Sequence, residues 1–311
     1  MNLDAIGNAA SKALGLRFNL VSLLPSWLLV LFFVALFSSG APSDRPSIGN
    51  TLAAAGKLAG PQIAIVFLGA LVAAVLLQPF QIRSVQLLEG YWGTSLIANR
   101  ARDIGVELQC RRLATLRADR WKARIGKESS HRLLQQQSAE RQRLYPVEAD
   151  LLPTQLGNIL RSAERRAGER YGLATVSTFP RLYPVMSERL TTAVDDFTAQ
   201  VDAAAQLCMT LGVATIVSVV VLLPYDFWLL VPTATAILAW FAYRGAMASA
   251  VYLGRLYETA FDLHRFDLLV ALHQKLPPDP VKERVSNAAL SQFLKHSDAS
   301  TAPCIKRYDH S

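Results

Sequence analysis

The chain has 311 residues, of which 51% are hydrophobic and 18% charged, and its formal net charge is +8. This composition is more apolar than that of an ordinary soluble enzyme and indicates an integral membrane protein with a sizeable soluble part. The three cysteines, Cys110, Cys208 and Cys304, lie far apart and form no CxxC pair, so neither a disulfide framework nor a zinc site is indicated. Most of the 32 basic residues are arginines, a usage that suggests a bacterium with a GC-rich genome.

Two apolar runs without charged residues lie in the first quarter of the chain, at Leu20–Phe37 and Ile63–Leu77. With their neutral flanks they reach the length of a membrane-spanning helix, roughly 17–25 residues. They predict a first transmembrane hairpin at 20–80, with spans at about 20–37 and 60–79.

The segment before the first span, 1–19, has apolar residues three and four positions apart. This spacing predicts an amphipathic helix on the inner membrane surface, and a frayed leader to the span is the alternative. The first run also admits a second interpretation as a cleaved signal peptide, because small residues follow it at 38–41. Its length favours a span that is not cleaved.

A polar, arginine-rich segment at 81–203 predicts a helical cytoplasmic domain. Between 81 and 143 there is no proline, and apolar residues recur at helical spacing. We therefore expect one or two long helices here, with breaks near Gly90–Gly93 and near Gly126.

Prolines and aromatic residues dominate the next stretch, 145–184. Within it, Thr154 is placed to cap a helix over about 155–170, and Gly172 is placed to end that helix. A further helix is expected to begin near Ser187 and to continue without a break into the third span.

The last third of the chain predicts a second hairpin at 204–243, with spans at about 205–223 and 227–243 separated by a tight turn. The fourth span has no stop signal, so its helix is expected to continue as an extension over 244–276 and to end at Pro277-Pro278. The remaining residues, 277–311, predict a short helix over about 281–294 and a disordered tail.

Arginines are concentrated after the second span, whereas the two links inside the hairpins carry few cations or none. Short loops rich in Lys and Arg stay on the cytoplasmic side. The expected fold is therefore an all-α integral membrane protein with four transmembrane helices in two hairpins, and with a helical cytoplasmic domain formed by the central segment and the C-terminal extensions. The expected location is the inner (plasma) membrane, multi-pass, with both termini in the cytoplasm.

Small residues recur every fourth position through the end of the fourth span, at Ala242, Ala246, Ala250 and Gly254. Such a stripe lets another helix approach closely, either in the same chain or in another subunit of a homo-oligomer. Generic alanine richness is the alternative explanation. The stripe continues into charged residues (Arg255, Glu258, Asp262, His264, Arg265 and Asp267) for which salt bridges at helical spacing are favoured over a metal or acid–base site.

The densest cluster of unusual residue types lies at 151–183, with the pattern PTxLGNxLRxxE, then RYG, then PRL. This stretch resembles one in uncharacterised multi-span membrane proteins of GC-rich bacteria, and the resemblance implies no activity. Asn158, Arg161, Glu164 and Arg181 predict a buried polar network that docks the short helix on the long ones, and a ligand pocket is the alternative. The candidate ligand- or partner-binding residues are Asn158, Arg161, Glu164, Arg170, Tyr171, Arg181 and Tyr183.

No catalytic, phosphate-binding or metal-binding motif is recognisable, and no cofactor is expected. The spans contain no ionisable residue, which disfavours an ion-coupled transporter. Acidic residues are interspersed among the arginines of 100–143, so we expect contacts with anionic lipid headgroups rather than with nucleic acid.

The favoured hypothesis is a non-enzymatic membrane scaffold or sensor whose cytoplasmic helical module binds an unknown protein partner or ligand. An oligomeric channel or membrane-perturbing effector is the first alternative, because the spans are free of charge and carry small residues. An enzyme with a cytoplasmic site near 158–183 is the second.

Overall fold

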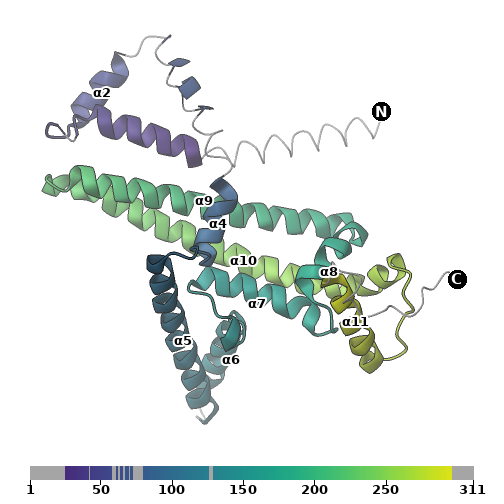
Figure 1. Ribbon diagram of the computed structural model, residues 1–311. Coiled ribbons are helices and arrows are strands. Elements are labelled where there is room, and N and C mark those ends of the chain that lie inside the picture. Colours follow the sequence, from purple (N-terminus) through teal and green to yellow (C-terminus); the bar gives the residue numbers. More distant parts are fainter. Residues whose placement is uncertain are drawn as a thin grey trace. The chain divides into compact units, whose positions relative to one another are not determined.

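The computed structural model describes residues 25–41, 43–57, 61, 64–65, 67–69, 71–72, 80–125 and 129–295, and these residues form helices and no strand (Figure 1). The predicted all-helical fold is confirmed. The predicted amphipathic segment 1–19, most of the second span and the tail after 295 lie outside the described residues.

The chain divides into two compact units. The first contains the described residues up to Leu87 together with Ala199–Ala246, and the second contains Leu88–Thr198 and the described residues from Met247 onward. The three boundaries fall inside helices: α4 (Phe80–Glu89), α9 (Glu188–Leu222) and α10 (Leu230–Ala271).

Within the first unit, a helix at Pro25–Ser38 is followed by a turn and by α2 (Ile48–Gly56). Ser47 caps α2, since its hydroxyl accepts a hydrogen bond from the Gly49 N–H at 3.2 Å. The link between the first two runs therefore contains a short helix that the sequence pattern did not predict.

The helix at Pro25–Ser38 packs on the turn between α9 and α10. Leu36 and Ala41 are buried together with Leu222 at the end of α9, and aromatic side chains of both segments surround them. At the other end of the same helix, the Gln206 side chain of α9 donates a hydrogen bond to the Ser26 hydroxyl at 3.4 Å, so the helix at Pro25–Ser38 contacts the second hairpin at both of its ends.

Helices α9 and α10 are joined by a turn and a short 3₁₀ helix, η3 (Asp226–Leu229), as expected for the second hairpin. The Thr215 hydroxyl of α9 donates a hydrogen bond to the Thr235 hydroxyl of α10 at 2.9 Å. Among the described residues, two helices are long and apolar enough to cross a membrane, at Glu188–Leu222 and Asp226–Ala271, while Pro25–Ser38 is a shorter apolar helix.

The second unit begins at the end of α4 (Phe80–Glu89) and continues through α5 (Leu96–Ile125) and α6 (Ser129–Arg143), which run antiparallel to each other (Figure 1). Gly90 and Gly93 both have left-handed φ angles, of 102° and 79°, which interrupt the helix between α4 and α5 as predicted. The second predicted break, near Gly126, falls between α5 and α6.

After η1 (Glu148–Asp150) come α7 (Gln155–Glu169), α8 (Thr175–Leu182) and η2 (Tyr183–Val185). Helix α7 begins and ends where the sequence predicts, because the Thr154 hydroxyl accepts from the Gly157 N–H at 3.1 Å and Gly172 adopts a φ of 77°. Helix α8 was not predicted, since Pro180 lies inside it and prolines disfavour a helical interpretation.

Helix α10 ends at Ala271, five residues before the predicted end at 276. His273 adopts a left-handed φ of 51°, and the N–H of Gln274 bonds to the carbonyl of Leu269 at 2.9 Å. This is a Schellman-type helix end in which a histidine occupies the left-handed position that is usually glycine. The residue types therefore did not predict that the helix ends here. The chain then forms α11 (Pro280–Lys295), whose predicted range was about 281–294.

Candidate ligand-binding cavity

The motif at 153–158 packs the start of α7 against the end of α4 and against α5. Pro153 lies so close to Gly90 and Gly105 that a Cβ on either glycine would come within 2.6 Å of it. A Cβ on Gly157 would lie 2.1 Å from the backbone carbonyl oxygen of Glu89. These glycines permit a close approach of backbones, and the unusual composition of the motif is thereby explained by packing.

Asn158 belongs to the same motif and holds the loop before α7 in place. It is fully buried, its Nδ2 donates to the Leu152 carbonyl at 2.9 Å, and its Oδ1 accepts from the Leu152 N–H at 2.8 Å. The side chain thus satisfies both backbone groups of a loop residue, as a strand neighbour would. Asn158 therefore has a structural role, and it is not among the lining residues of the cavity described below.

The far end of α7 is fixed to α10 and α11. The Tyr171 hydroxyl donates to the Asp262 carboxylate at 2.5 Å, and the Arg265 guanidinium lies 4.3 Å from the centre of the Tyr171 ring. Arg265 also forms an ion pair with the buried Glu283 at 2.8 Å. Asn287 of α11 donates to the Tyr171 carbonyl at 3.0 Å.

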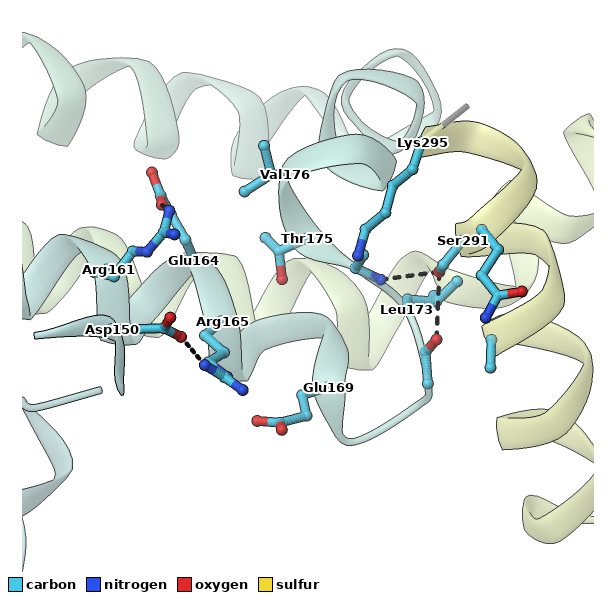
Figure 2. Close-up of a pocket in the computed structure, with 14 residues that line it drawn as sticks. Asp150, Arg161, Glu164, Arg165, Glu169, Leu173, Thr175, Val176, Ser291 and Lys295 are labelled. Atoms are coloured by element: carbon cyan, nitrogen blue, oxygen red, sulfur yellow. Dashed lines mark hydrogen bonds and ion pairs between the residues drawn. The ribbon is translucent and has the colours of Figure 1, made fainter. Parts of the chain in front are cut away.

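These contacts leave a cavity of about 490 Å³ between α7, α8 and α11 (Figure 2). Its apolar wall contains Leu173, Ala174, Val176 and Ala288. At its edge, Ser291 accepts from the Ala174 N–H at 2.9 Å and donates to the Gly172 carbonyl at 3.3 Å, so α11 is tied to the α7–α8 turn. The charged residues of the lining are Asp150, Arg161, Glu164, Arg165, Glu169 and Lys295.

The charges of the lining are mixed and balanced, with three basic and three acidic side chains. Arg165 forms an ion pair with Asp150, and Arg161 lies 3.8 Å from Glu164 (Figure 2). Burial raises the pKa of the Glu164 carboxyl, and the charge of Arg161 opposes this rise. Lys295 points into the cavity and takes part in none of the ion pairs found among the described residues.

Two of the seven predicted binding residues, Arg161 and Glu164, line this cavity. The predicted network of four polar residues is not formed. Asn158 bonds to the Leu152 backbone, and the exposed Arg181 donates to the Ser177 carbonyl of its own helix at 2.5 Å. The reason is that α8, which was not predicted, carries Arg181 away from α7.

The other three candidates lie outside the cavity. Arg170 is exposed at the end of α7, and Tyr171 contacts Asp262 as described above. The Tyr183 hydroxyl donates to the Asp195 carboxylate of α9 at 2.7 Å, and this hydrogen bond raises the pKa of the phenol.

Sequence reasoning missed most of the lining. Arg161, Arg165 and Glu169 are four residues apart and therefore share one face of α7. That charged face was recognisable in the sequence, whereas the contribution of α11, including Lys295, depends on contacts between distant segments.

The C-terminal part of the small-residue stripe of α10, Ala250 and Gly254, lies against α7 of the same chain. A Cβ on Gly254 would lie 2.7 Å from the Ala163 Cβ. Ala250 and Ala163 line one and the same small cavity, Ala246 is also buried, and Ala242 is half-buried. At Gly254, the helix that approaches the stripe is therefore α7 of the same chain.

Three of the charged residues that continue the stripe, His264, Arg265 and Asp267, have a charged partner. His264 pairs with Asp267 at 2.8 Å, as predicted. Arg265 pairs with Glu283 rather than with the Asp262 carboxylate, because the latter accepts from Tyr171 and Glu283 lies buried where a charge needs a partner. Among the residues that the structure describes, no group of His, Cys, Asp and Glu side chains is arranged to hold a metal ion.

Neither a protein-family model, nor a curated protein, nor a solved structure matches this chain.

Proposed function

We propose that this chain is a multi-pass membrane protein that acts as a non-enzymatic sensor or scaffold, anchored by α9 and α10, and that its cavity between α7, α8 and α11 binds a small ligand on the cytoplasmic side. The observation that carries the proposal is this cavity of about 490 Å³ with paired and unpaired charges over an apolar wall, in a chain that also contains two helices apolar enough to cross a membrane.

The exposure of the apolar stretches supports membrane anchoring. A core helix of a soluble protein is mostly buried, whereas only 28% of the most apolar window of α9 and 17% of that of α10 are buried within the described structure. Large side chains such as Ile216, Val220 and Phe241 are more than half exposed. Apolar surface of this extent favours a lipid environment.

The ends of the charge-free stretch formed by η3 and the first part of α10 support the same assignment. At 1.5 Å per residue the stretch 227–243 spans roughly 25 Å, close to the hydrocarbon thickness of a bilayer. Trp228 lies near its start, and Trp240 and Tyr243 lie at its end, as in the aromatic belts of membrane proteins. Arg244 follows directly, with its guanidinium 5.8 Å from the centre of the Trp240 ring.

The lining of the cavity indicates the chemical class of the ligand. Balanced charges select against a strongly anionic or cationic molecule, and the unpaired Lys295 and the exposed Glu169 offer one cationic and one anionic contact. A small zwitterion with an apolar portion, such as an amino acid or a dipeptide, fits this arrangement.

The test uses the full chain in detergent with a panel of amino acids and dipeptides, and it measures thermal unfolding and calorimetric binding. Ala288→Trp places a large ring in the cavity without removing any charge, and Ala289→Trp, at the neighbouring exposed position outside the lining, is the matched control. We expect at least one zwitterion to bind to the wild type and to Ala289→Trp, but not to Ala288→Trp. If no member of the panel binds, or if Ala288→Trp binds as well as the control, the cavity is not the ligand site.

A further inference from the structure

Helix α5 carries a line of large apolar side chains that lies outside the proposed ligand cavity. Ile97, Ile104 and Leu108 are 83%, 61% and 51% exposed. They are seven and four residues apart, so at about 3.6 residues per turn they lie on one side of the helix. Single exposed apolar residues are ordinary on a protein surface, whereas an aligned group indicates an interaction surface. We call this group the α5 apolar line.

The packed side of α5 lies elsewhere around the helix. Gly105, Gln109 and Leu113 are buried, and at about 100° per residue they lie roughly a third of a turn from the α5 apolar line. The Gln109 side chain donates to the Pro153 carbonyl at 3.5 Å and accepts from the Tyr145 hydroxyl at 3.2 Å. These contacts fix the rotation of α5 about its axis. The α5 apolar line is therefore not part of the core of the second unit.

Arginines border the α5 apolar line on both sides. Arg100 and Arg112 are exposed and lie about 60° from the line, in opposite directions around the helix. The acid next to the line, Glu107, forms an ion pair with Arg111 at 2.8 Å. Over its whole length α5 has eight basic and three acidic residues. An apolar line with cations on both sides is typical of a helix that lies on an anionic membrane surface.

We propose that α5 docks on the cytoplasmic surface of the membrane, with Ile97, Ile104 and Leu108 in the headgroup region and the neighbouring arginines on anionic lipids. The place of α5 in the chain supports this occupant, because the apolar run Ile63–Leu77 ends fewer than twenty residues before α5 begins. The exposed Tyr91 lies between them, as an interfacial aromatic residue would. A second copy of the chain is a poorer occupant, since two such faces would bring their arginines together. The proposal rests on the anchoring by α9 and α10.

The test uses the full chain with its three cysteines replaced by serine, reconstituted in vesicles of phosphatidylcholine with or without phosphatidylglycerol. A fluorophore is attached to Ile104→Cys or, as the matched control, to Ala114→Cys, an exposed position on another side of α5. Spin-labelled lipids quench a fluorophore that lies in the membrane surface. We expect quenching at position 104 in vesicles that contain phosphatidylglycerol, with a marked decrease in phosphatidylcholine alone and at high salt. Position 114 should be quenched little in either kind of vesicle.

The arginine variants decide whether the charges beside the line hold α5 on the membrane. Each basic residue near an anionic surface contributes roughly a factor of five to binding. Arg100→Gln combined with Arg112→Gln is therefore expected to lower the ratio of docked to free α5 about tenfold or more, measured by the quenching at position 104. Arg170→Gln combined with Arg189→Gln removes two exposed arginines from other helices and is the matched control, which should be quenched as the parent protein is.

An alkaline wash of the vesicles separates this proposal from the anchoring on which it rests. Loss of the chain from the vesicles would contradict the anchoring, and the docking of α5 would fall with it. In protein that withstands the wash, equal quenching at positions 104 and 114, or quenching unaffected by the variant at Arg100 and Arg112, would overturn the docking of α5 alone. A disulfide between two copies of Ile104→Cys without lipid quenching would overturn it too, and would assign the face to a second copy of the chain.

Discussion

Gly254 of α10 and Ala163 of α7 approach each other so closely that a Cβ on the glycine would lie 2.7 Å from the Ala163 Cβ. The contact places α7 directly against the helix that continues from the second hairpin. Because residues of α7 line both the proposed ligand cavity and the small cavity at Ala250, the shape of both cavities depends on how α7 packs against α10.

Gly254→Ala is therefore expected to destabilise the protein by about 1–3 kcal/mol, the typical cost of overpacking. Gly245→Ala is the matched control on the same helix, since a Cβ there would meet nothing within 4 Å. The control should be neutral or should stabilise the protein by up to about 1 kcal/mol through helix propensity. Unfolding in detergent measures both, and equal effects of the two substitutions would show that α7 is not seated on Gly254.

Asn158→Ala removes the side chain that satisfies both backbone groups of Leu152. Each backbone group left unpaired in a buried site costs about 1–3 kcal/mol, so we expect a loss of stability of that order or more. Asn99 provides the control, because its exposed amide also donates to a loop carbonyl, that of Thr94, at 3.3 Å. Asn99→Ala is expected to change stability by less than about 0.5 kcal/mol. A small effect at both positions would contradict the role assigned to Asn158.

Arg265→Met leaves the Glu283 carboxylate buried without its partner. The two side chains are 19% and 8% exposed, and loss of one member of such a pair costs about 3–5 kcal/mol. The double substitution Arg265→Met with Glu283→Leu should recover most of this loss, since no buried charge then remains. Arg111→Met, in an ion pair whose members are 73% and 60% exposed, should cost less than about 1 kcal/mol. Denaturant unfolding of the four proteins gives the comparison, and a double variant no more stable than Arg265→Met would argue against the charge-burial explanation.

Glu164 gives the protein a specific pH dependence. Its folded-state pKa is raised by burial above its ordinary value of 4.5, so the folded chain binds more protons than the unfolded chain at pH values between the two. Stability from this group therefore increases as the pH falls through the folded pKa and levels off below 4.5. Glu164→Gln is expected to be more stable than the wild type at neutral pH, with the difference vanishing near pH 4, about the ordinary pKa.

The matched variant for this prediction is Arg161→Met. Removing the cation that lowers the pKa of Glu164 should raise that pKa further and enlarge the pH dependence. Melting temperatures recorded from about pH 4, near the ordinary carboxyl pKa, to about pH 8 provide the measurement. The interpretation fails if Glu164→Gln and the wild type differ by a constant amount across this range.

The long helices could be predicted because their signals are local. The cap at Thr154, the left-handed Gly172 and the helix that starts after Ser187 all lie where short-range patterns place them. Helix α8 was missed because Pro180 outweighed the helical tendency of its neighbours, and the end of α10 was missed because His273 is not a residue type that marks a helix end.

The cavity could not be predicted, since its walls meet through contacts between distant segments. Asn287 and Tyr171 are 116 residues apart in sequence, and their hydrogen bond brings α11 to the end of α7. The pattern around Asn158 was correctly recognised as unusual, but its composition reflects close backbone packing against Glu89 and Pro153 rather than ligand binding.

The proposal that α9 and α10 anchor a cytoplasmic unit is tested most directly by cysteine labelling from one side of the membrane. In a background in which Cys110, Cys208 and Cys304 are serine, single cysteines are placed at Asp226, in the turn between the two helices, and at the exposed Arg170. A membrane-impermeant maleimide is expected to label Asp226→Cys in intact cells and Arg170→Cys only after the membrane is permeabilised. Equal labelling of both positions in intact cells, or recovery of the whole chain in the soluble fraction after an alkaline wash, would contradict it.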